Sequence, residues 1–412
     1  MSTLVLPQKK LDMGKDASFS GQPIFRQLLN FINKKKIYRL AQSKQSDRYY
    51  KRFDTYHHLV TMLYCMFHDC TSLREVTTGM QACYLRLKHL GINYCPRRST
   101  LSDANKNRNV EVFEAIHKYL YKKNRRILSD SPSLKKWESQ LFIVDSTTIS
   151  LFKDILKNAG NNPINGKRKG GIKVHTLIKA DEDVPCLINM NAAASHDTPF
   201  IQNMKLTKGS IVVFDKAYVD YNQYNKWTNE QVTWVTRMRK GTKYRTVLKA
   251  KILPQALDIG ILMDNKIILG HNHNKKKAKV NARLVVYLDK STNKEFSFIT
   301  NNLELHAIDI ANIYKRRWQI ELLFKRFKQS YPLQSFLGDN VNAIKIQIWT
   351  SLIADLILQC IRTKLKRKMS HSGVASLIRI HLMTYIDLVR FLNNPEASLL
   401  MQYPRGPTLK LF

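Results

Sequence analysis

Cysteine is scarce in this chain of 412 residues, and so are acidic side chains. The six cysteines include no Cys-x-x-Cys pair, which argues against a disulfide framework and a structural zinc site. Cys65, His68 and Cys70 lie close together in sequence, but without a second pair of ligands a structural role is the better interpretation. The sequence therefore gives no reason to seek cysteine-based chemistry.

Long hydrophobic runs are missing as well. The N-terminal segment contains no apolar run of the length of a signal peptide. The most apolar late segment, residues 343–361, is interrupted by Lys345 and Asp355, so we expect a buried helix there and not a membrane span. We accordingly expect a cytoplasmic protein without a membrane partner.

The shortage of acids leaves a large positive charge. The sequence has 68 Lys and Arg against 31 Asp and Glu, a formal net charge of +37. Such a field concentrates phosphate backbones around the protein, so nucleic acid is the expected partner, with an anionic membrane surface as the alternative. The 44% share of hydrophobic residues is enough for a large core, so we expect a globular protein of two or three domains.

The N-terminal part, up to about residue 125, is expected to be helical and basic. Apolar residues recur at helical spacing in segments 24–32 and 58–67. The cations and tyrosines between them suit a DNA-contacting surface, although a solvated charged face would have the same composition. These residues are Lys34, Lys35, Lys36, Tyr38, Arg39, Lys44, Arg48, Tyr49, Tyr50, Lys51 and Arg52.

A second candidate for DNA contact lies near the end of this helical part. Arg97 and Arg98 precede a polar helix expected over residues 101–108, with Ser99 or Thr100 as its N-cap. Helix N-termini bind phosphate well, so we expect Arg97 and Arg98 to contact DNA.

After a polar segment at residues 129–133, which predicts a domain boundary near residue 130, the pattern changes to strands. Two short apolar runs, 141–144 and 211–214, end at Asp145 and Asp215 respectively, so the two acids have the same local setting. Between them we expect a hairpin and then a helix, formed by residues 171–179, 184–191 and the segment from about residue 198.

Residues 230–300 are expected to be a strand-rich insertion into this α/β core. Their predicted strands are 233–238, 267–269, 283–288 and 295–300. A strong helix is expected next, over residues 307–328.

One face of this helix gathers polar groups. At about 100° per residue, Tyr314, Arg317, Glu321 and Lys328 fall within a stripe roughly 60° wide, beside an apolar arc that should be buried. The arrangement would hold the Glu321 carboxylate beside a cleft, with cations on either side. Ordinary i,i+4 ion pairs on an amphipathic helix would give the same pattern.

Asp145, Asp215 and Glu321 carry more weight together than separately. Carboxylates that converge in a small site repel one another and favour divalent cations, and oxygen ligands suit Mg²⁺ or Mn²⁺ better than zinc. Two such ions can activate the attacking oxygen and stabilise the leaving oxygen of a phosphoryl displacement. The sequence therefore predicts a metal-dependent enzyme acting on DNA.

The motif Tyr314-x2-Arg317-x3-Glu321-x6-Lys328 resembles the Tyr-Arg-Glu-Lys motif of DDE insertion-sequence transposases of the IS-four group, with every spacing kept. The similarity extends over nearly the whole chain, and the N-terminal part is similar to the DNA-binding region of that group. The matching blocks are residues 144–148 around the first acid, 171–175 after it, 214–220 around the second acid, and 300–302 before the last catalytic helix.

The resemblance implies a ribonuclease-H-like α/β core that is interrupted by a β-rich insertion and preceded by a helical DNA-binding domain. The corresponding domains are 1–130 (DNA-binding), 131–229 and 301–370 (catalytic core), 230–300 (insertion) and 371–412 (C-terminal helical region). Cut-and-paste cleavage and strand transfer at the terminal inverted repeats of double-stranded DNA would follow, by a homodimer on paired ends, in the cytoplasm and at the nucleoid of a prokaryote.

The resemblance also assigns roles to residues. Asp145, Asp215 and Glu321 would be catalytic and would bind two Mg²⁺ ions, or Mn²⁺, per active site. Tyr314, Arg317 and Lys328 would hold DNA phosphates beside them. Outside the motif, we expect Lys173 to face phosphate and His175 to be structural, whereas the basic runs 275–277 and 362–368 could be either DNA-facing or solvated.

Two departures from the group stand out. The second-acid block has Ala217 where the group commonly has glycine, so we expect a slightly different backbone there. Relatives that form DNA hairpins use a tryptophan in the insertion to hold a flipped base, and none stands just before Thr300. Phe296, Phe298 or Trp234 could stack on a base instead, but a core role is the simpler interpretation of each.

Two alternatives to a transposase share these features. A ribonuclease-H-like nuclease would use the same three acids without strand transfer. A domesticated, non-catalytic DNA-binding protein would keep the positive charge, but the undamaged acids and motif spacing argue against decay.

Overall fold

The structure is a computed structural model that describes residues 21–129, 135, 137–150, 171–192, 197–270, 278–333 and 335–396. Its residues form two compact units, 1–112 with 357–412 and 113–356, which we describe separately. The limits fall inside two helices, α6 (Glu111–Leu128) and α12 (Val341–Arg362), whereas the sequence suggested limits near residues 130 and 370. Most of the predicted linker 129–133 lies outside the described residues. Tertiary packing, which local composition does not record, sets this division.

The first unit is helical and is built around α3, in which every residue except His68 is buried. The helices predicted at 24–32 and 58–67 are confirmed as α1 and part of α3. The helices of this unit are α1 (Ile24–Leu29), α2 (Lys34–Ser43), α3 (Thr55–His68), α4 (Leu73–Ala82), the 3₁₀ helix η1 (Tyr84–Leu90), α5 (Arg98–Asn107), α13 (His371–His381) and α14 (Leu388–Asn393).

The basic segment of this unit lies on its surface. Helix α2 buries Ile37 and Ala41, while Lys35 and Arg39 are exposed. Lys34 and Lys44 are exceptions, because the Lys34 ammonium donates to the Gly91 carbonyl at 2.7 Å and Lys44 pairs with Glu111 at 2.8 Å. Most cations of this segment are therefore available to a polyanion.

The N-cap predicted at Ser99 or Thr100 is wrong. Helix α5 begins at Arg98, and Arg97 is its N-cap, with extended backbone and no capping side chain. Because Arg98 is already helical, Ser99 and Thr100 fall in the first turn, where they cannot precede it as caps. Arg97 and Arg98 are both exposed at this helix start.

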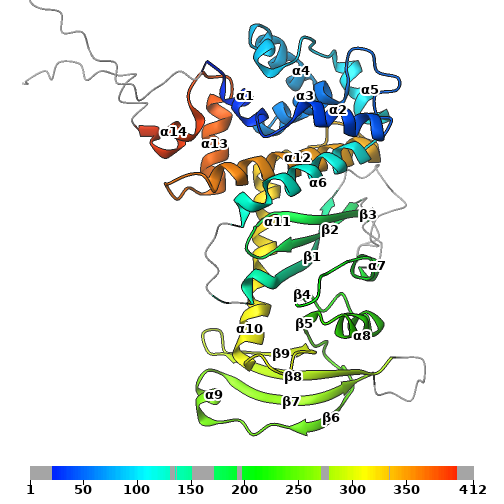
Figure 1. Cartoon of the computed structure of the whole chain (residues 1–412), viewed down its shortest axis with the longest axis vertical. Coiled ribbons are helices and arrows are strands. Elements are labelled where there is room, and N and C mark those ends of the chain that lie inside the picture. Colours follow the sequence, from blue (N-terminus) through cyan, green and yellow to red (C-terminus); the bar gives the residue numbers. More distant parts are fainter. Residues whose placement is uncertain are drawn as a thin grey trace, which may run out of the picture. The chain divides into compact units, whose positions relative to one another are not determined.

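The second unit is built on one sheet, with the strand order β3-β2-β1-β4-β5-β9-β8-β7-β6 among the described residues (Figure 1). The pairs β1–β4 and β4–β5 are parallel, and the other pairs are antiparallel. The strands are β1 (Leu141–Ser150), β2 (Gly171–Lys179), β3 (Pro185–Ala192), β4 (Ile211–Phe214), β5 (Thr233–Arg237), β6 (Tyr244–Lys249), β7 (Ile261–Leu269), β8 (Val280–Asp289) and β9 (Lys294–Thr300).

Most predicted strands are confirmed, with three differences. The β2–β3 hairpin and β4 are found as expected. Strand β1 does not end at Asp145 but continues to Ser150, because β2 pairs with its second half. Strand β5, which we had included in the insertion, pairs in parallel with β4. The exposed strand β6 was not predicted, since it lacks the apolar alternation of a half-buried strand.

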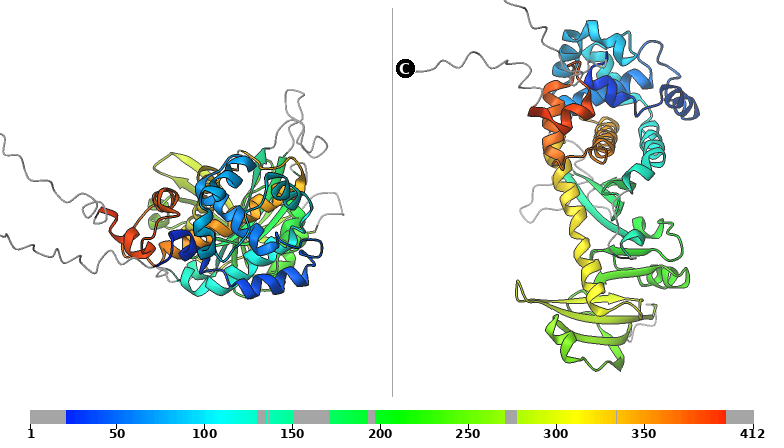
Figure 2. Two further views of the ribbon diagram at one scale, coloured as in Figure 1. Left: turned by 90° about the horizontal axis from the view of Figure 1, so that it is seen from above. Right: turned by 60° about the vertical axis from the view of Figure 1, so that its left-hand side comes forward.

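Helices cover this sheet, and where each helix begins and ends determines which of its polar side chains lie beside the strands. Besides α6 and α12 they are the 3₁₀ helix η2 (Glu138–Gln140), α7 (Thr198–Gln202), α8 (Tyr221–Asn229), α9 (Pro254–Asp258), α10 (Ala307–Arg316) and α11 (Trp318–Ser330). The single helix predicted at 307–328 is thus divided at Arg317; α10 and α11 follow one another in the right-hand view of Figure 2. Amide-to-carbonyl bonds from Arg317 to Tyr314 and from Ile320 to Arg317 tighten the chain here into a 3₁₀-like turn.

An aromatic cluster fixes α8 against the parallel strands. The Phe214 ring lies 5.6 Å from both Tyr224 and Trp227, and Trp234 stacks on Tyr224 at 4.5 Å. All four side chains are fully buried. Their packing holds the loop between β4 and α8, in which Asp215 lies.

Helix α12 has the length and apolarity of a membrane span, but 94% of its most hydrophobic window is buried inside the protein. The buried helix expected over residues 343–361 is therefore confirmed. In the second unit its Trp349 contacts His117 of α6, with ring centroids 5.5 Å apart.

His117 should make the stability of the protein depend on pH. Burial lowers the pKa of His117 from 6.5 to about 4. Because the folded protein keeps the ring neutral, the unfolded chain binds one more proton below pH 6.5, and stability falls as the pH falls toward 4. This group alone should cost about 2 kcal/mol of unfolding free energy between pH 7 and pH 5.

Urea denaturation of the wild type and of His117→Asn at both pH values measures this effect. The variant should be less stable at pH 7 but should lose about 2 kcal/mol less than the wild type on acidification. An equal loss in both proteins would show that His117 is not held neutral.

Candidate functional site

Strand pairing brings the first two acids together. Strands β1 and β4 run parallel, with Val144 opposite Phe214. Asp145 directly follows Val144, and Asp215 directly follows Phe214. Neighbouring strands lie about 4.8 Å apart, and residues at matching positions of the pleat point to the same face. The carboxylates of Asp145 and Asp215 therefore leave the sheet as neighbours.

Arg317 joins the third acid to the first. Its Nη1 donates to Asp145 Oδ2 at 2.7 Å, and its Nη2 donates to Glu321 Oε1, one helical turn away. Helix α11, which carries Glu321, also packs against β1. The guanidinium thus occupies the space between two carboxylates, which would otherwise repel each other.

Asp145 has a raised pKa in this site. Burial is the main cause that raises its pKa, to about 6. The Ser146 amide and Arg317 lower the pKa, whereas the charges of Asp215 and Glu321 raise it further. Asp145 therefore feels both other acids, and an added cation would relieve this repulsion.

The donor set fits a hard divalent cation. Carboxylate oxygens, with no thiolate or imidazole among them, are the ligands preferred by Mg²⁺ and Mn²⁺. The described residues contain no group of three Asp, Glu, His or Cys side chains already close enough to share a metal ion. This agrees with the position of Arg317, which holds Asp145 and Glu321 on either side of its guanidinium.

An open hollow of about 530 Å³ lies over two of the acids. Asp145 and Glu321 line it together with Lys325 and Lys328, and Lys328 is exposed. Lys328 and Glu321 thus share one surface, as the helical stripe predicted. A phosphate in this hollow would meet both carboxylates and cations.

Tyr314 is largely buried and is not a surface residue. Its ring packs on Phe298 with centroids 4.9 Å apart, and the Arg317 guanidinium lies 5.7 Å from its centroid. Burial raises the pKa of Tyr314 to about 12, so its hydroxyl stays protonated. Tyr314 can therefore support Arg317 from below and donate a hydrogen bond.

Two polar contacts anchor α11 to the β2–β3 turn. Gln319 Nε2 donates to the Ala180 carbonyl at 2.9 Å, and Arg326 Nη1 donates to Asp183 Oδ2 at 2.7 Å. Arg326 also makes a bidentate pair with Asp355 of α12, at 3.1 and 3.0 Å. Asp355 is fully buried, so its charge depends on Arg326. These bonds set the position of the helix that carries Glu321.

Arg326, Asp183 and Asp355 are not among the site residues that the sequence predicts. In the sequence, Asp355 indicates only that residues 343–361 do not span a membrane. The available signal was an acid within an apolar helix that should be buried, because a buried charge needs a partner.

A second polar cluster supports the strand that carries Asp145. His175 Nδ1 lies 3.2 Å from the Tyr218 hydroxyl, and the His175 ring stacks on Phe200 at 5.3 Å. Burial lowers the pKa of His175, which favours the neutral ring. A hydrogen bond with Ser146 lowers the pKa of Tyr218, although burial raises it overall. His175 therefore has the structural role that we expected.

Lys173 lies in the same cluster and not on an open surface. Its ammonium donates to Asp197 at 2.9 Å, and its side chain is only 17% exposed. Asp197 is also 3.7 Å from His175 Nδ1. Lys173 would have to leave Asp197 to bind a phosphate, so this geometry favours an internal role.

Ala217 needs no glycine conformation. It is not among the described residues with positive φ. Its amide donates to Asp215 Oδ2 at 3.2 Å, and the Tyr218 amide donates to the Asp215 carbonyl at 3.0 Å. The loop therefore closes around Asp215 in a conformation that alanine accepts.

The three aromatic candidates for base stacking differ. Trp234 and Phe298 are buried, which confirms the core interpretation for both. Phe296 is partly exposed, with the Arg237 guanidinium 5.0 Å from its ring centroid.

The remaining basic candidates belong to the first unit or lie outside the described residues. Arg97 and Arg98 belong to the first unit. In the run 362–368, Arg362 donates to Gln359 at 2.7 Å and Arg367 pairs with Glu396 at 2.8 Å, so part of this run is engaged internally. The run 275–277 lies outside the described residues.

Comparison with known families gives two matches. A model described as a transposase DDE domain matches residues 136–356, and one described as a domain of unknown function matches residues 20–93. The chain is similar to a predicted transposase, y4zB, of Sinorhizobium fredii, with 28% identity over 64% of this chain and 71% of the relative. It is similar to a predicted transposase for insertion sequence element IS4SA of Synechocystis sp., with 28% identity over 70% of this chain and 78% of the relative.

A solved structure described as a piggyBac transposase synaptic complex with hairpin DNA aligns with 94% of this chain and 81% of its own, with a TM-score of 0.38 and 11% identity. A likeness this low carries no argument about fold or site.

The anchor of α11 can be tested by changing Arg326. Arg326→Met leaves Asp355 buried without its main partner, so we expect a loss of about 3–5 kcal/mol in the free energy of unfolding. Arg326→Met combined with Asp355→Leu removes both charges and should recover much of that loss. Urea denaturation measures each variant. A double variant as unstable as the sum of the two single variants would contradict the proposed pairing.

Proposed function

This chain belongs to the family of transposase DDE domains, and on that premise we propose that Asp145, Asp215 and Glu321 are its catalytic carboxylates. The contact that supports the assignment most strongly is Arg317, which donates to both Asp145 and Glu321. The register of β1 and β4 adds Asp215 beside Asp145. Three acids from distant parts of the chain would thus form one site.

The same three residues would hold the metal ions of the reaction, for which we propose two Mg²⁺, or Mn²⁺, per site. Their oxygen donors and the raised pKa of Asp145 fit such ions. When bound, the metal supplies activation of the attacking oxygen and stabilisation of the leaving oxygen. For Asp145 and Glu321 to act as ligands, the Arg317 guanidinium must move from between them.

The cations of α11 would position the DNA. Lys328 lies in the hollow over Asp145 and Glu321, where it can pair with a backbone phosphate. Arg317, once released from the carboxylates, can bind a phosphate through two of its N–H groups. Tyr314 would support Arg317 through ring contact and donate its hydroxyl hydrogen. These groups hold the scissile strand while the acids act on it.

The rest of the chain supports a transposase of the IS-four group. We propose that the exposed cations of the first unit, Arg97 and Arg98 included, bind the terminal inverted repeats. The core that carries the acids would be ribonuclease-H-like, and β6, β7 and β8 would form its insertion. Cut-and-paste cleavage and strand transfer by a homodimer on paired ends, in the cytoplasm and at the nucleoid, complete the proposal.

Neutral substitutions test the catalytic acids. Asp145→Asn, Asp215→Asn or Glu321→Gln should each reduce Mg²⁺-dependent cleavage of a plasmid carrying the DNA that flanks this reading frame by at least about a thousandfold, because a metal-bound charge is lost. Binding of the same DNA should survive. The matched control is Asp258→Asn, an exposed acid of the same unit, which should cleave normally. Full cleavage by any of the three variants would remove that acid from the site.

A second assay separates transposition from simple hydrolysis. A pre-cut terminal end with a free 3′-hydroxyl, supplied with a target plasmid and Mg²⁺, should become covalently joined to the target. Joined product on a gel is the expected result, since strand transfer uses the same acids with a DNA hydroxyl as the attacking group. Hydrolysis of the target without joining would instead identify a nuclease.

A further inference from the structure

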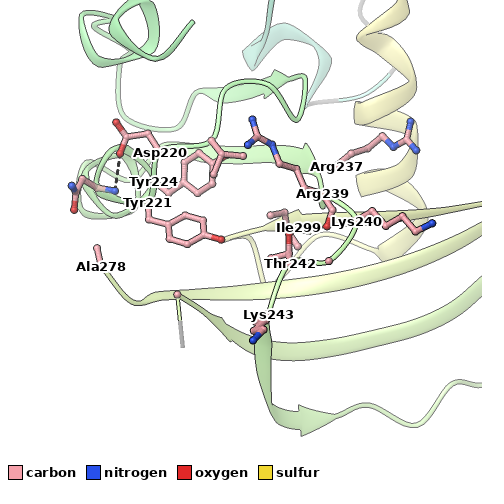
Figure 3. Close-up of a pocket in the computed structure, with 14 residues that line it drawn as sticks. Asp220, Tyr221, Tyr224, Arg237, Arg239, Lys240, Thr242, Lys243, Ala278 and Ile299 are labelled. Carbon is pink, nitrogen blue, oxygen red and sulfur yellow. Dashed lines mark hydrogen bonds between the residues drawn. The ribbon is translucent and has the colours of Figure 1, made fainter. Parts of the chain in front are cut away.

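A second hollow, of about 590 Å³, opens beside the loop that follows Asp215. Figure 3 shows its walls, which come from the start of α8, the end of β5 with the turn after it, and strand ends of β7, β8 and β9. All of these belong to the second unit. None of the three catalytic acids lines it, so it is separate from the hollow over Asp145 and Glu321.

Four cations line this hollow: Arg237, Arg239, Lys240 and Lys243. None of them forms an ion pair within the described residues. The one acid of the lining, Asp220, is already engaged, since it caps α8 and accepts from Gln202 Nε2 at 2.6 Å. Four cations against one acid give the hollow a net positive charge.

Arg239 connects the hollow to the catalytic loop. Its Nε donates to the Lys216 carbonyl at 2.6 Å, and its Nη2 donates to the Ala217 carbonyl at 3.0 Å. These are the two residues that follow Asp215. An anion bound near Arg239 would thus lie a short distance along the chain from the second acid.

One wall of the hollow is aromatic. Tyr221 projects from α8 toward the strands in Figure 3. Gly270 stands behind it with φ +75, and a Cβ at that position would lie 2.4 Å from the Ala278 carbonyl oxygen and 3.4 Å from Tyr221 Cδ2. The glycine therefore lets the backbone pass closely behind the Tyr221 ring.

We propose that this hollow is a second DNA site, in which Lys240 and Lys243 bind two backbone phosphates of the strand that continues past the catalytic acids. The inference rests on the proposed function, because it takes DNA as the substrate held over Asp145 and Asp215. Arg239 holds the loop after Asp215 at the rim of the hollow. Tyr221 packs against a sugar of the same DNA strand. DNA held in this way meets cations on both sides of the acids, from Lys328 and from this hollow.

The charge of the hollow and its place beside Asp215 favour a polyanion over a small anion. A free phosphate would need converging donors, whereas Lys240 and Lys243 are both exposed, on a turn and at its end. Exposed cations in a row suit successive phosphates of one strand.

The salt dependence of DNA binding tests the site. Binding of a fluorescent random-sequence duplex by the full chain is measured by anisotropy in EDTA, over a series of salt concentrations. Removing two phosphate contacts with Lys240→Gln and Lys243→Gln together should lower the slope of log K against log salt by about 1.8. At 0.1 M salt the affinity should fall about 60-fold. The matched control, Lys290→Gln with Lys294→Gln, removes the same charge from exposed positions in the β8–β9 turn and at the start of β9, and should change the slope by much less.

Equal slopes for the two double variants would overturn the proposal, since the effect would then come from net charge alone. A second arm adds inorganic phosphate at constant ionic strength. If phosphate binds to the wild type but not to Lys240→Gln with Lys243→Gln, and displaces no DNA from either protein, the hollow is a small-anion site and the DNA assignment is wrong.

A cleavage assay distinguishes failure of the second DNA site from failure of the proposed function. In a Mg²⁺ cleavage assay the variant Lys240→Gln with Lys243→Gln should need more DNA but reach the wild-type rate at saturation, because no catalytic group is changed. Wild-type cleavage together with equal slopes would refute the second DNA site and leave the transposase assignment intact. No cleavage by the wild type would count against the proposed function itself.

Discussion

The burial of Asp145 beside two further carboxylates, Asp215 and Glu321, whose charges oppose its ionisation, is the constraint on which this site depends. Asp145 and Asp215 are fixed as neighbours by the register of two parallel strands, and Glu321 approaches from α11. The pKa of Asp145, raised to about 6 mainly by burial, shows the cost of burying a carboxylate near the charges of Asp215 and Glu321. Arg317 reduces that cost by bonding to two of the acids at once. We infer that Arg317 holds Asp145 and Glu321 until metal ions replace it between them and a DNA phosphate binds the released guanidinium.

The surrounding fold keeps the acids close against this repulsion. The bonds of Gln319 and Arg326 hold α11 to the β2–β3 turn, and Asp355 fixes Arg326 from α12. The aromatic cluster around Trp234 holds the loop with Asp215. Rigid supports of this kind allow a site to keep charges that would otherwise separate.

Much of the fold could be predicted from the sequence, because local patterns determine much of it. Apolar runs identified β1 and β4, and helical spacing identified the helix of Glu321. The extension of β1 and the place of β5 depend on partner strands, which the local sequence does not contain. The partner of Lys173 was missed for the same reason, since Asp197 is 24 residues away. The three acids could be selected by residue type and resemblance, but Arg317 as their link required the structure.

The most direct test of this account is the binding of Mn²⁺, followed by electron paramagnetic resonance, with and without the three acids. The wild type should bind Mn²⁺ tightly enough to reduce the free-ion signal, and the triple variant Asp145→Asn, Asp215→Asn, Glu321→Gln should not. Binding by Arg317→Gln should be at least as tight as in the wild type, because the competing guanidinium is gone. Equal Mn²⁺ binding by the wild type and the triple variant would contradict the metal site on which the account depends.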